Sequence, residues 1–136
     1  MQSFTKIVLA VAAVAGLVSA APATSSAVIE SRSMSGDLTY YTPGLGACGV
    51  YNSEQDAIVA LSRELFDPHT PNGNPNLNTY CGRKIKISRG GKSVVVTVRD
   101  RCEGCQKNDL DVPVKVFSQL ANPNDGRVKM TWDWVS

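Results

Sequence analysis

The chain has 136 residues, of which 43% are apolar and 19% are charged, and its formal net charge is only +2. This length corresponds to one domain, and the apolar content is high enough to bury a core, which excludes a chain disordered throughout. The small net charge excludes a nucleic-acid clamp driven by phosphate neutralisation, which needs a concentrated Lys/Arg surface. We therefore expect one folded domain without a nucleic-acid partner.

The first twenty residues have the organisation of a secretory signal peptide. Residues 1–6 form a short positively charged segment, and residues 7–17 are almost continuously apolar. The small residues at 18–20 are typical of a signal-peptidase cleavage site. The apolar run ends by Ala23, short of the roughly 20 residues needed to cross a bilayer. We expect cleavage of residues 1–20, no membrane anchor, and a secreted, extracellular protein.

The mature chain begins with a segment unlike the rest. Residues 21–35 are small and polar and contain no aromatic side chain, which is typical of a flexible tail. The predicted folded domain spans residues 36–136.

The four cysteines are expected to form two disulfides. In an oxidising compartment, four cysteines in a small domain more often form bridges than a redox motif or a metal site. A zinc site usually has two close ligand pairs, whereas only Cys102 and Cys105 are close in this sequence. We therefore expect no metal. Three pairings with Cys48 and Cys81 remain open on this reasoning.

The predicted elements of the domain are mainly strands. Residues 38–42 are rich in strand-forming side chains and stop at a Pro-Gly pair. Residues 57–66 are ambiguous, because their apolar spacing fits a helix while their first half also fits a buried strand. Residues 67–78 are dense in Asn, Pro and Gly and predict a loop that carries His69, the one histidine, in solvent.

The clearest local pattern is a hairpin. Residues 83–89 alternate between apolar and polar, Gly90-Gly91 suits a two-residue turn, and residues 92–100 return. Because side chains alternate along a strand, Asp100 is expected to continue an inward row of valines at 94, 96 and 98.

A helix and a final strand complete the predicted elements. Pro113, at a first-turn position, opens a helix over residues 114–120. In the last strand, residues 127–135, one face carries two apolar side chains followed by Trp132 and Trp134. This pattern predicts core packing for Trp132. Five or six short strands with a brief helix predict a mainly β fold, a small closed barrel.

Four segments resemble a known family. They are GDLTYYTPGLGACG (residues 36–49), VRDRCEGC (98–105), DLDVPVKVFSQLA (109–121) and VKMTWDWV (128–135). In this order they resemble the expansin/barwin-related domains, which include bacterial rare lipoprotein A and the small fungal proteins called loosenins. The resemblance implies a single six-stranded double-psi β-barrel with one or two short helices. It also implies a Cys48–Cys81 bridge, which leaves Cys102 with Cys105.

The resemblance also implies a function. Hydrolases of this group use two carboxylates, an acid and a base that activates water. The acid position matches Asp111, but Thr42 stands at the base position, and a threonine hydroxyl is no general base at neutral pH. The resemblance therefore implies non-hydrolytic loosening of a cell-wall polysaccharide (cellulose, chitin or peptidoglycan) by a monomer without a cofactor. The groove residues would be Tyr41, Thr42, Asp100 and Asp111.

Other interpretations of the carboxylates and of the function stay open. Asp111 is also placed to cap the helix that follows it, and Asp100 lies between two arginines. A lytic transglycosylase acting on peptidoglycan needs only one acid/base carboxylate, so Thr42 does not exclude it. A protein-binding module, such as a protease inhibitor or an effector, would use the loop at residues 67–79 instead.

Overall fold

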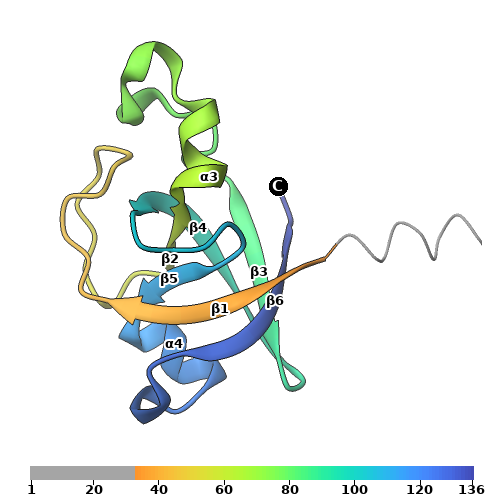
Figure 1. Ribbon diagram of the computed structural model, residues 1–136. Helices are drawn as coiled ribbons and strands as arrows, with labels where there is room; N and C mark the ends of the chain where they lie inside the picture. Colours follow the sequence, from red (N-terminus) through yellow and green to blue (C-terminus); the bar gives the residue numbers. More distant parts are fainter. Residues whose placement is uncertain (1–32) are drawn as a thin grey trace, which may run out of the picture. The chain divides into compact units, whose positions relative to one another are not determined.

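Six strands close into a barrel in the computed structural model, which describes residues 33–136 (Figure 1). The strands are β1 (Met34–Tyr41), β2 (Ile58–Ser62), β3 (Lys84–Arg89), β4 (Lys92–Cys102), β5 (Leu110–Pro113) and β6 (Val128–Trp134). Their order around the barrel is β1-β5-β2-β4-β3-β6; β1/β5 and β2/β4 are parallel and the other pairs antiparallel. The predicted mainly β, six-stranded barrel is confirmed. The predicted signal peptide and residues 21–32 of the predicted tail lie outside the described residues.

The barrel begins earlier than the predicted boundary at residue 36. Met34 pairs with Trp132, and Ser35 pairs with Thr131, so both belong to β1. Small polar residues suggested a tail at this point, but backbone pairing with β6 overrides their weak strand propensity.

The ambiguous segment at residues 57–66 is a strand followed by a helix. All five residues of β2 are buried, and the strand lies between β4 and β5 in the barrel. Ser62 ends the strand and caps α3 (Arg63–Phe66), where its hydroxyl accepts a hydrogen bond from the Leu65 N–H at 3.2 Å. The same hydroxyl donates to the Lys107 carbonyl at 2.7 Å, which ties α3 to the turn before β5.

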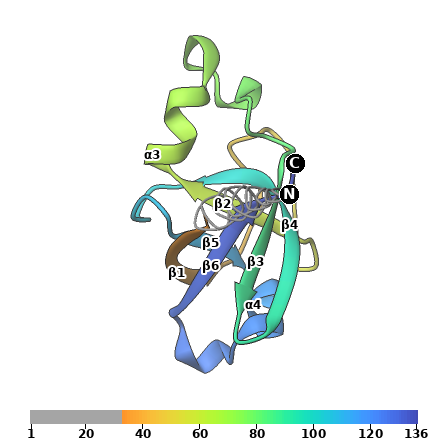
Figure 2. The ribbon, with the colours of Figure 1, turned by 90° about the vertical axis from the view of Figure 1, so that its right-hand side faces the viewer.

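The predicted loop after α3 is a chain of three 3-10 turns, Asp67–His69, Pro71–Gly73 and Pro75–Leu77, which extends from one end of the barrel (Figure 2). The buried Asn78 side chain joins the two ends of this segment, because its Nδ2 donates to the Phe66 carbonyl at 2.7 Å. His69 is not simply solvated, since its ring stacks on Tyr80 with centroids 3.9 Å apart.

The predicted hairpin and second helix are confirmed. Gly90 and Gly91 both have positive φ, 57° and 83°, in the two-residue turn between β3 and β4, the conformation that glycine adopts without steric cost. Pro113 precedes α4 (Val114–Leu120), whose apolar side covers the end of the barrel near this hairpin (Figure 1).

The core lies inside the barrel and continues under α4. Trp132 is fully buried, as predicted, and its indole N–H donates to the Asn108 carbonyl at 2.9 Å. Trp134 is only partly buried and lies under the Arg83 guanidinium, 4.0 Å from the ring centroid. In residues 33–136, no helix has the length and apolar character to cross a bilayer.

Two disulfides join Cys48 to Cys81 and Cys102 to Cys105, with Cα–Cα distances of 5.8 and 5.6 Å. The pairing implied by the family resemblance is therefore confirmed. The first bridge fastens the loop after β1 to the segment before β3, and the second closes the turn after β4.

Candidate functional site: a carboxylate cleft

The cleft is built on a row of four residues that lie side by side on adjacent strands. Thr39 of β1 pairs with Asp111 of β5, Asp111 pairs with Ala60 of β2, and Ala60 pairs with Asp100 of β4. The two carboxylates are thus two strands apart, about 10 Å between backbones at normal strand spacing. The row lines a cleft of about 430 Å³ on the outer surface of the barrel.

A β-bulge aims Asp100 into this cleft. Val98 pairs with Val59, but the next residue of β2, Ala60, pairs with Asp100, which leaves Arg99 as an extra residue on β4. The bulge reverses the alternation, so Asp100 faces the side opposite to the buried Val98. The prediction that Asp100 continues the inward row of valines is therefore wrong, because strict period-two alternation holds only for a regular strand.

Asp111 has an open oxygen, that is, a carboxylate oxygen that accepts no hydrogen bond from the described residues. Its Oδ1 accepts a hydrogen bond from the Thr39 hydroxyl at 2.9 Å. Its Oδ2 lies 4.0 Å from the sulfur of Cys102, which is oxidised and has no proton to donate. Burial raises the pKa of Asp111, the charge of Asp100 acts in the same direction, and the Thr39 hydrogen bond opposes both. Asp111 makes no capping hydrogen bond to α4, so its capping interpretation is wrong.

Asp100, in contrast, is occupied by three donors. Its Oδ2 accepts from the Tyr41 hydroxyl at 3.0 Å, and its Oδ1 accepts from the backbone N–H groups of Ala47 and Arg101 at 2.9 and 2.8 Å. Burial and the charge of Asp100 raise the pKa of Tyr41 far above its usual range, so the phenol keeps its proton and stays a donor. The arginine side chains do not pair with Asp100.

The rim of the cleft carries further charges. Arg101 forms a bidentate ion pair with Asp67, with Nε–Oδ1 and Nη2–Oδ2 distances of 2.6 and 2.9 Å. Its Nη1 also lies 3.2 Å from Oε2 of Glu103. Arg127 lies on the other side, paired with Asp37 at 3.0 Å. The charge of Arg127 lowers the pKa of Asp111, against the larger effect of burial.

Three of the four predicted groove residues line the cleft: Tyr41, Asp100 and Asp111. Thr42 does not, because its hydroxyl donates to Glu54 at 3.1 Å in the loop after β1. Sequence reasoning missed Thr39, although strand alternation from Tyr41 places it on the same face. Within residues 33–136, no group of three or more His, Cys, Asp or Glu side chains is arranged to hold a metal ion.

Comparison with known proteins identifies the family. Residues 35–132 match the family of double-psi β-barrel domains described as "Lytic transglycolase". The chain belongs to this family. Its expansin/barwin-related character is supported by matches to an EG45-like domain containing protein of Citrus jambhiri and a putative ripening-related protein of rice.

The relatives differ in what their names describe. The papain inhibitor of Streptomyces mobaraensis is 35% identical over 130 residues, 92% of this chain and 87% of the inhibitor. The solved Streptomyces papain inhibitor superposes with a TM-score of 0.70 at 34% identity, over 77% of this chain and 96% of that one. An Asp f 7 allergen homologue of Arthroderma benhamiae is 41% identical over 87 residues, 62% of this chain, and this chain spans only 28% of its length.

One further structure supports the fold alone. A Clavibacter michiganensis expansin, solved with cellohexaose, has a TM-score of 0.61 at 22% identity, over 76% of this chain and 50% of that chain.

Proposed function

We propose that this protein is a secreted cell-wall protein that binds a polysaccharide strand in the carboxylate cleft and loosens its packing without cleaving it. The open Oδ2 of Asp111 carries the proposal, because it is an acceptor already held in place and lacking a donor among the described residues. A sugar hydroxyl satisfies such an acceptor. The Tyr41 ring beside it adds an apolar surface for a sugar face.

The charges in the cleft favour binding over hydrolysis. Three carboxylates line it, but Asp100 accepts three hydrogen bonds and Glu103 is exposed and paired with Arg101. Inverting hydrolysis needs a second, free carboxylate that activates water on the far side of the sugar ring. Of the two carboxylates that the strands hold in the cleft, Asp100 and Asp111, only Asp111 has an oxygen without a hydrogen-bond donor among the described residues. This is compatible with binding or with a one-carboxylate transglycosylase.

A pull-down tests the proposal and separates these two outcomes. Wild-type protein and Asp111→Asn are incubated with insoluble cellulose, chitin and peptidoglycan, and soluble sugars are analysed. We expect binding that weakens about tenfold or more in Asp111→Asn, the size of a lost charged hydrogen bond, with no soluble product. Asp125→Asn, the same charge change on the exposed turn before β6, is the matched control and should bind normally.

Two results would contradict the proposal. Release of anhydro-sugar fragments that depends on Asp111 would identify a transglycosylase. Equal binding by wild type and Asp111→Asn would place the polymer elsewhere on the surface.

A second candidate is cysteine-protease inhibition, which the similarity to the papain inhibitor over most of both chains favours. The loop at residues 43–52 and the loop before β3 are joined by the Cys48–Cys81 bridge. Both expose apolar side chains to solvent, namely Leu45, Tyr51 and Leu77. Solvent-exposed apolar side chains gathered on linked loops are typical of a protein-binding surface.

Papain inhibition assays distinguish this candidate from the first. If the loops inhibit, Tyr51→Ala and Leu77→Ala should weaken inhibition while Asp111→Asn leaves it unchanged. An inhibition constant unaffected by either loop variant, or no inhibition of papain at all, would count against the second candidate.

A further inference from the structure

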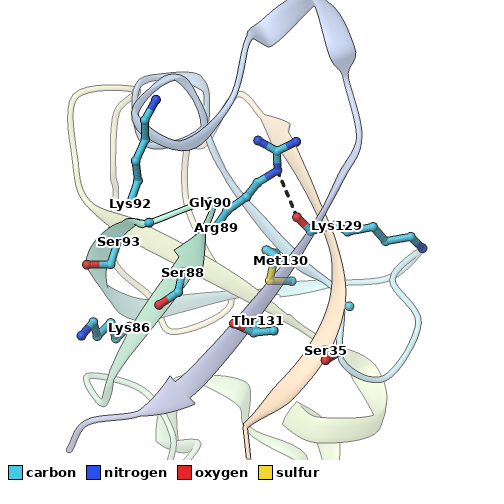
Figure 3. Close-up of a pocket in the computed structure, with 12 residues that line it drawn as sticks. Ser35, Lys86, Ser88, Arg89, Gly90, Lys92, Ser93, Lys129, Met130 and Thr131 are labelled. Atoms are coloured by element: carbon cyan, nitrogen blue, oxygen red, sulfur yellow. Dashed lines mark hydrogen bonds between the residues drawn. The ribbon is translucent and has the colours of Figure 1, made fainter.

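A second groove lies on the other half of the barrel, on the outer surface of β1, β6, β3 and β4 (Figure 3). Its volume is about 690 Å³, compared with about 430 Å³ for the carboxylate cleft. Among the described residues, the groove and the cleft share no lining residue. A ligand in the groove therefore makes contacts independent of those proposed for Asp111.

The floor of the groove is a row of hydroxyl groups in register across four strands. Ser35 pairs with Thr131, Thr131 pairs with Ser88, and Ser88 pairs with Ser93. At normal strand spacing the row is about 14 Å long. None of the four hydroxyls makes a hydrogen bond to another described side chain or backbone group. Each is free to donate one hydrogen bond and to accept others.

The edges of the groove are basic. Lys86, Arg89, Lys92 and Lys129 line it, and no Asp or Glu of residues 33–136 does. In Figure 3, Lys92 and Arg89 lie on the side of the hydroxyl row that faces the hairpin turn at Gly90, and Lys86 lies on the opposite side. The four side chains thus surround the row rather than forming one cluster.

These cations differ in how far they are already neutralised. Within residues 33–136, neither Lys86 nor Lys92 has a carboxylate within ion-pair distance. Lys129 pairs with Asp37 at 2.7 Å. Arg89 makes no ion pair there, but its Nε and Nη1 donate to the carbonyls of Lys129 and Leu120, both at 3.1 Å, which fixes its guanidinium over β6 and the end of α4.

We propose that this groove binds an anionic polysaccharide. The hydroxyl row matches the donors and acceptors of sugar hydroxyls, and the surrounding bases match carboxylate or sulfate groups repeated along the polymer. No aromatic side chain from the part of the chain that the structure describes lines the groove, so this part offers no stacking platform of the kind that single-stranded nucleic acid uses. Its one large apolar lining residue, Met130, is buried, which leaves nothing to insert into a bilayer.

The test compares two polymers with the same sugar backbone, one with charged carboxylates and one with neutral methyl esters. Binding of the protein to polygalacturonate and to its fully methyl-esterified, neutral form is measured by isothermal titration at low and high salt. We expect binding to the charged polymer alone, weakened by salt because exposed charges are screened. Lys86→Gln combined with Lys92→Gln should weaken it roughly tenfold, since each exposed ionic contact contributes a factor of a few.

One control variant and one further groove variant accompany this test. Lys107→Gln combined with Lys115→Gln makes the same change in net charge at exposed positions outside the groove and should bind as wild type. Thr131→Val removes a hydroxyl from the floor at nearly constant shape and should weaken binding by a smaller factor. Since all four lysines are exposed, thermal melting should show both double variants folded.

Three outcomes would overturn the proposal. One is equal binding of the neutral and the charged polymer. Another is equal weakening by the groove pair and the control pair, which would reveal only an effect of net charge. The third is tighter binding to single-stranded DNA or to phosphatidylserine vesicles of matched charge, which would assign the groove to another class of partner. Failure of Asp111→Asn to affect neutral polymers bears on the cleft alone.

Discussion

The carboxylate cleft and the basic groove occupy opposite halves of one barrel and share strands β1 and β4. Among the described residues, three carboxylates line the cleft, Asp100, Glu103 and Asp111, whereas four bases and no acid line the groove. They also differ in construction. Side-chain hydrogen bonds from distant segments hold the cleft, while regular strand alternation places the hydroxyls of the groove. Damage to loops should therefore affect the cleft more than the groove.

Removing the Cys48–Cys81 bridge should lower the free energy of unfolding more than any other change predicted below. This bridge closes a loop of 34 residues, and the chain-entropy model gives it about 4 kcal/mol, against about 2 kcal/mol for the four-residue loop of Cys102–Cys105. Denaturant melts of Cys48→Ala/Cys81→Ala and Cys102→Ala/Cys105→Ala measure both losses. The larger loss should come from the first pair, and the reverse order would show that native-state strain outweighs loop entropy.

Gly46→Ala should damage the cleft and spare the groove. A Cβ at Gly46 would lie 2.5 Å from the Arg99 carbonyl oxygen and 3.3 Å from the Asp100 carboxyl carbon. Relief requires a shift of the loop that donates the Ala47 N–H to Asp100, at a cost of about 1–3 kcal/mol.

A matched substitution is available in the same loop. Gly44 has open space around its Cβ position and an ordinary φ, so Gly44→Ala should leave stability unchanged. Gly46→Ala and Gly44→Ala are compared by their melting temperatures, by their binding to the polymer that the cleft binds and by their binding to the anionic polymer. Equal effects of the two alanines, or a loss of anionic polymer binding in Gly46→Ala, would contradict the separation of the two sites.

The groove illustrates what strand alternation predicts and the cleft what it does not. The hairpin at 83–100 was predictable because Gly-Gly and alternating apolar residues are local signals. Two expectations failed where contacts distant in sequence decide. The bulge at Arg99 changes the face of β4 on which Asp100 lies, and Ser35 joins β1 through pairing with Thr131. The sequence near Asp100 or Ser35 contains no signal that indicates which strand pairs with it.

The family resemblance supplied what residue chemistry left open in the cleft. Spacing alone allowed three cysteine pairings and allowed Asp111 to be a helix cap. The resemblance implied the pairing that the structure shows, and it singled out Tyr41 and Asp111. It also carried Thr42 into the groove, whereas this chain's Glu54 holds that hydroxyl in a loop.

Breaking the Arg101–Asp67 pair should have a smaller effect on stability. The pair is bidentate, but Asp67 is half exposed, and ion pairs of that kind contribute about 0.2–1 kcal/mol. A double-mutant cycle with Arg101→Gln and Asp67→Asn isolates the interaction. A coupling within that range is expected, with anionic polymer binding unchanged. A coupling near zero would show that this ion pair contributes nothing measurable to the stability of the cleft.

The smallest effect on stability should come from Asp111→Asn, and the sign of that effect is informative. Burial raises the pKa of Asp111 above its ordinary value of 3.8, so the folded protein binds a proton more tightly than the unfolded chain. Stability from this group is then fully present below the ordinary pKa and is lost as pH rises through the folded-state value. At neutral pH the ionised carboxylate is a cost that asparagine removes while still accepting from Thr39. Asp111→Asn should melt above wild type at pH 7 and together with it near pH 3. A variant that melts lower at pH 7 would mean that Asp111 serves the fold, and the cleft would lose the residue that most distinguishes it from the groove.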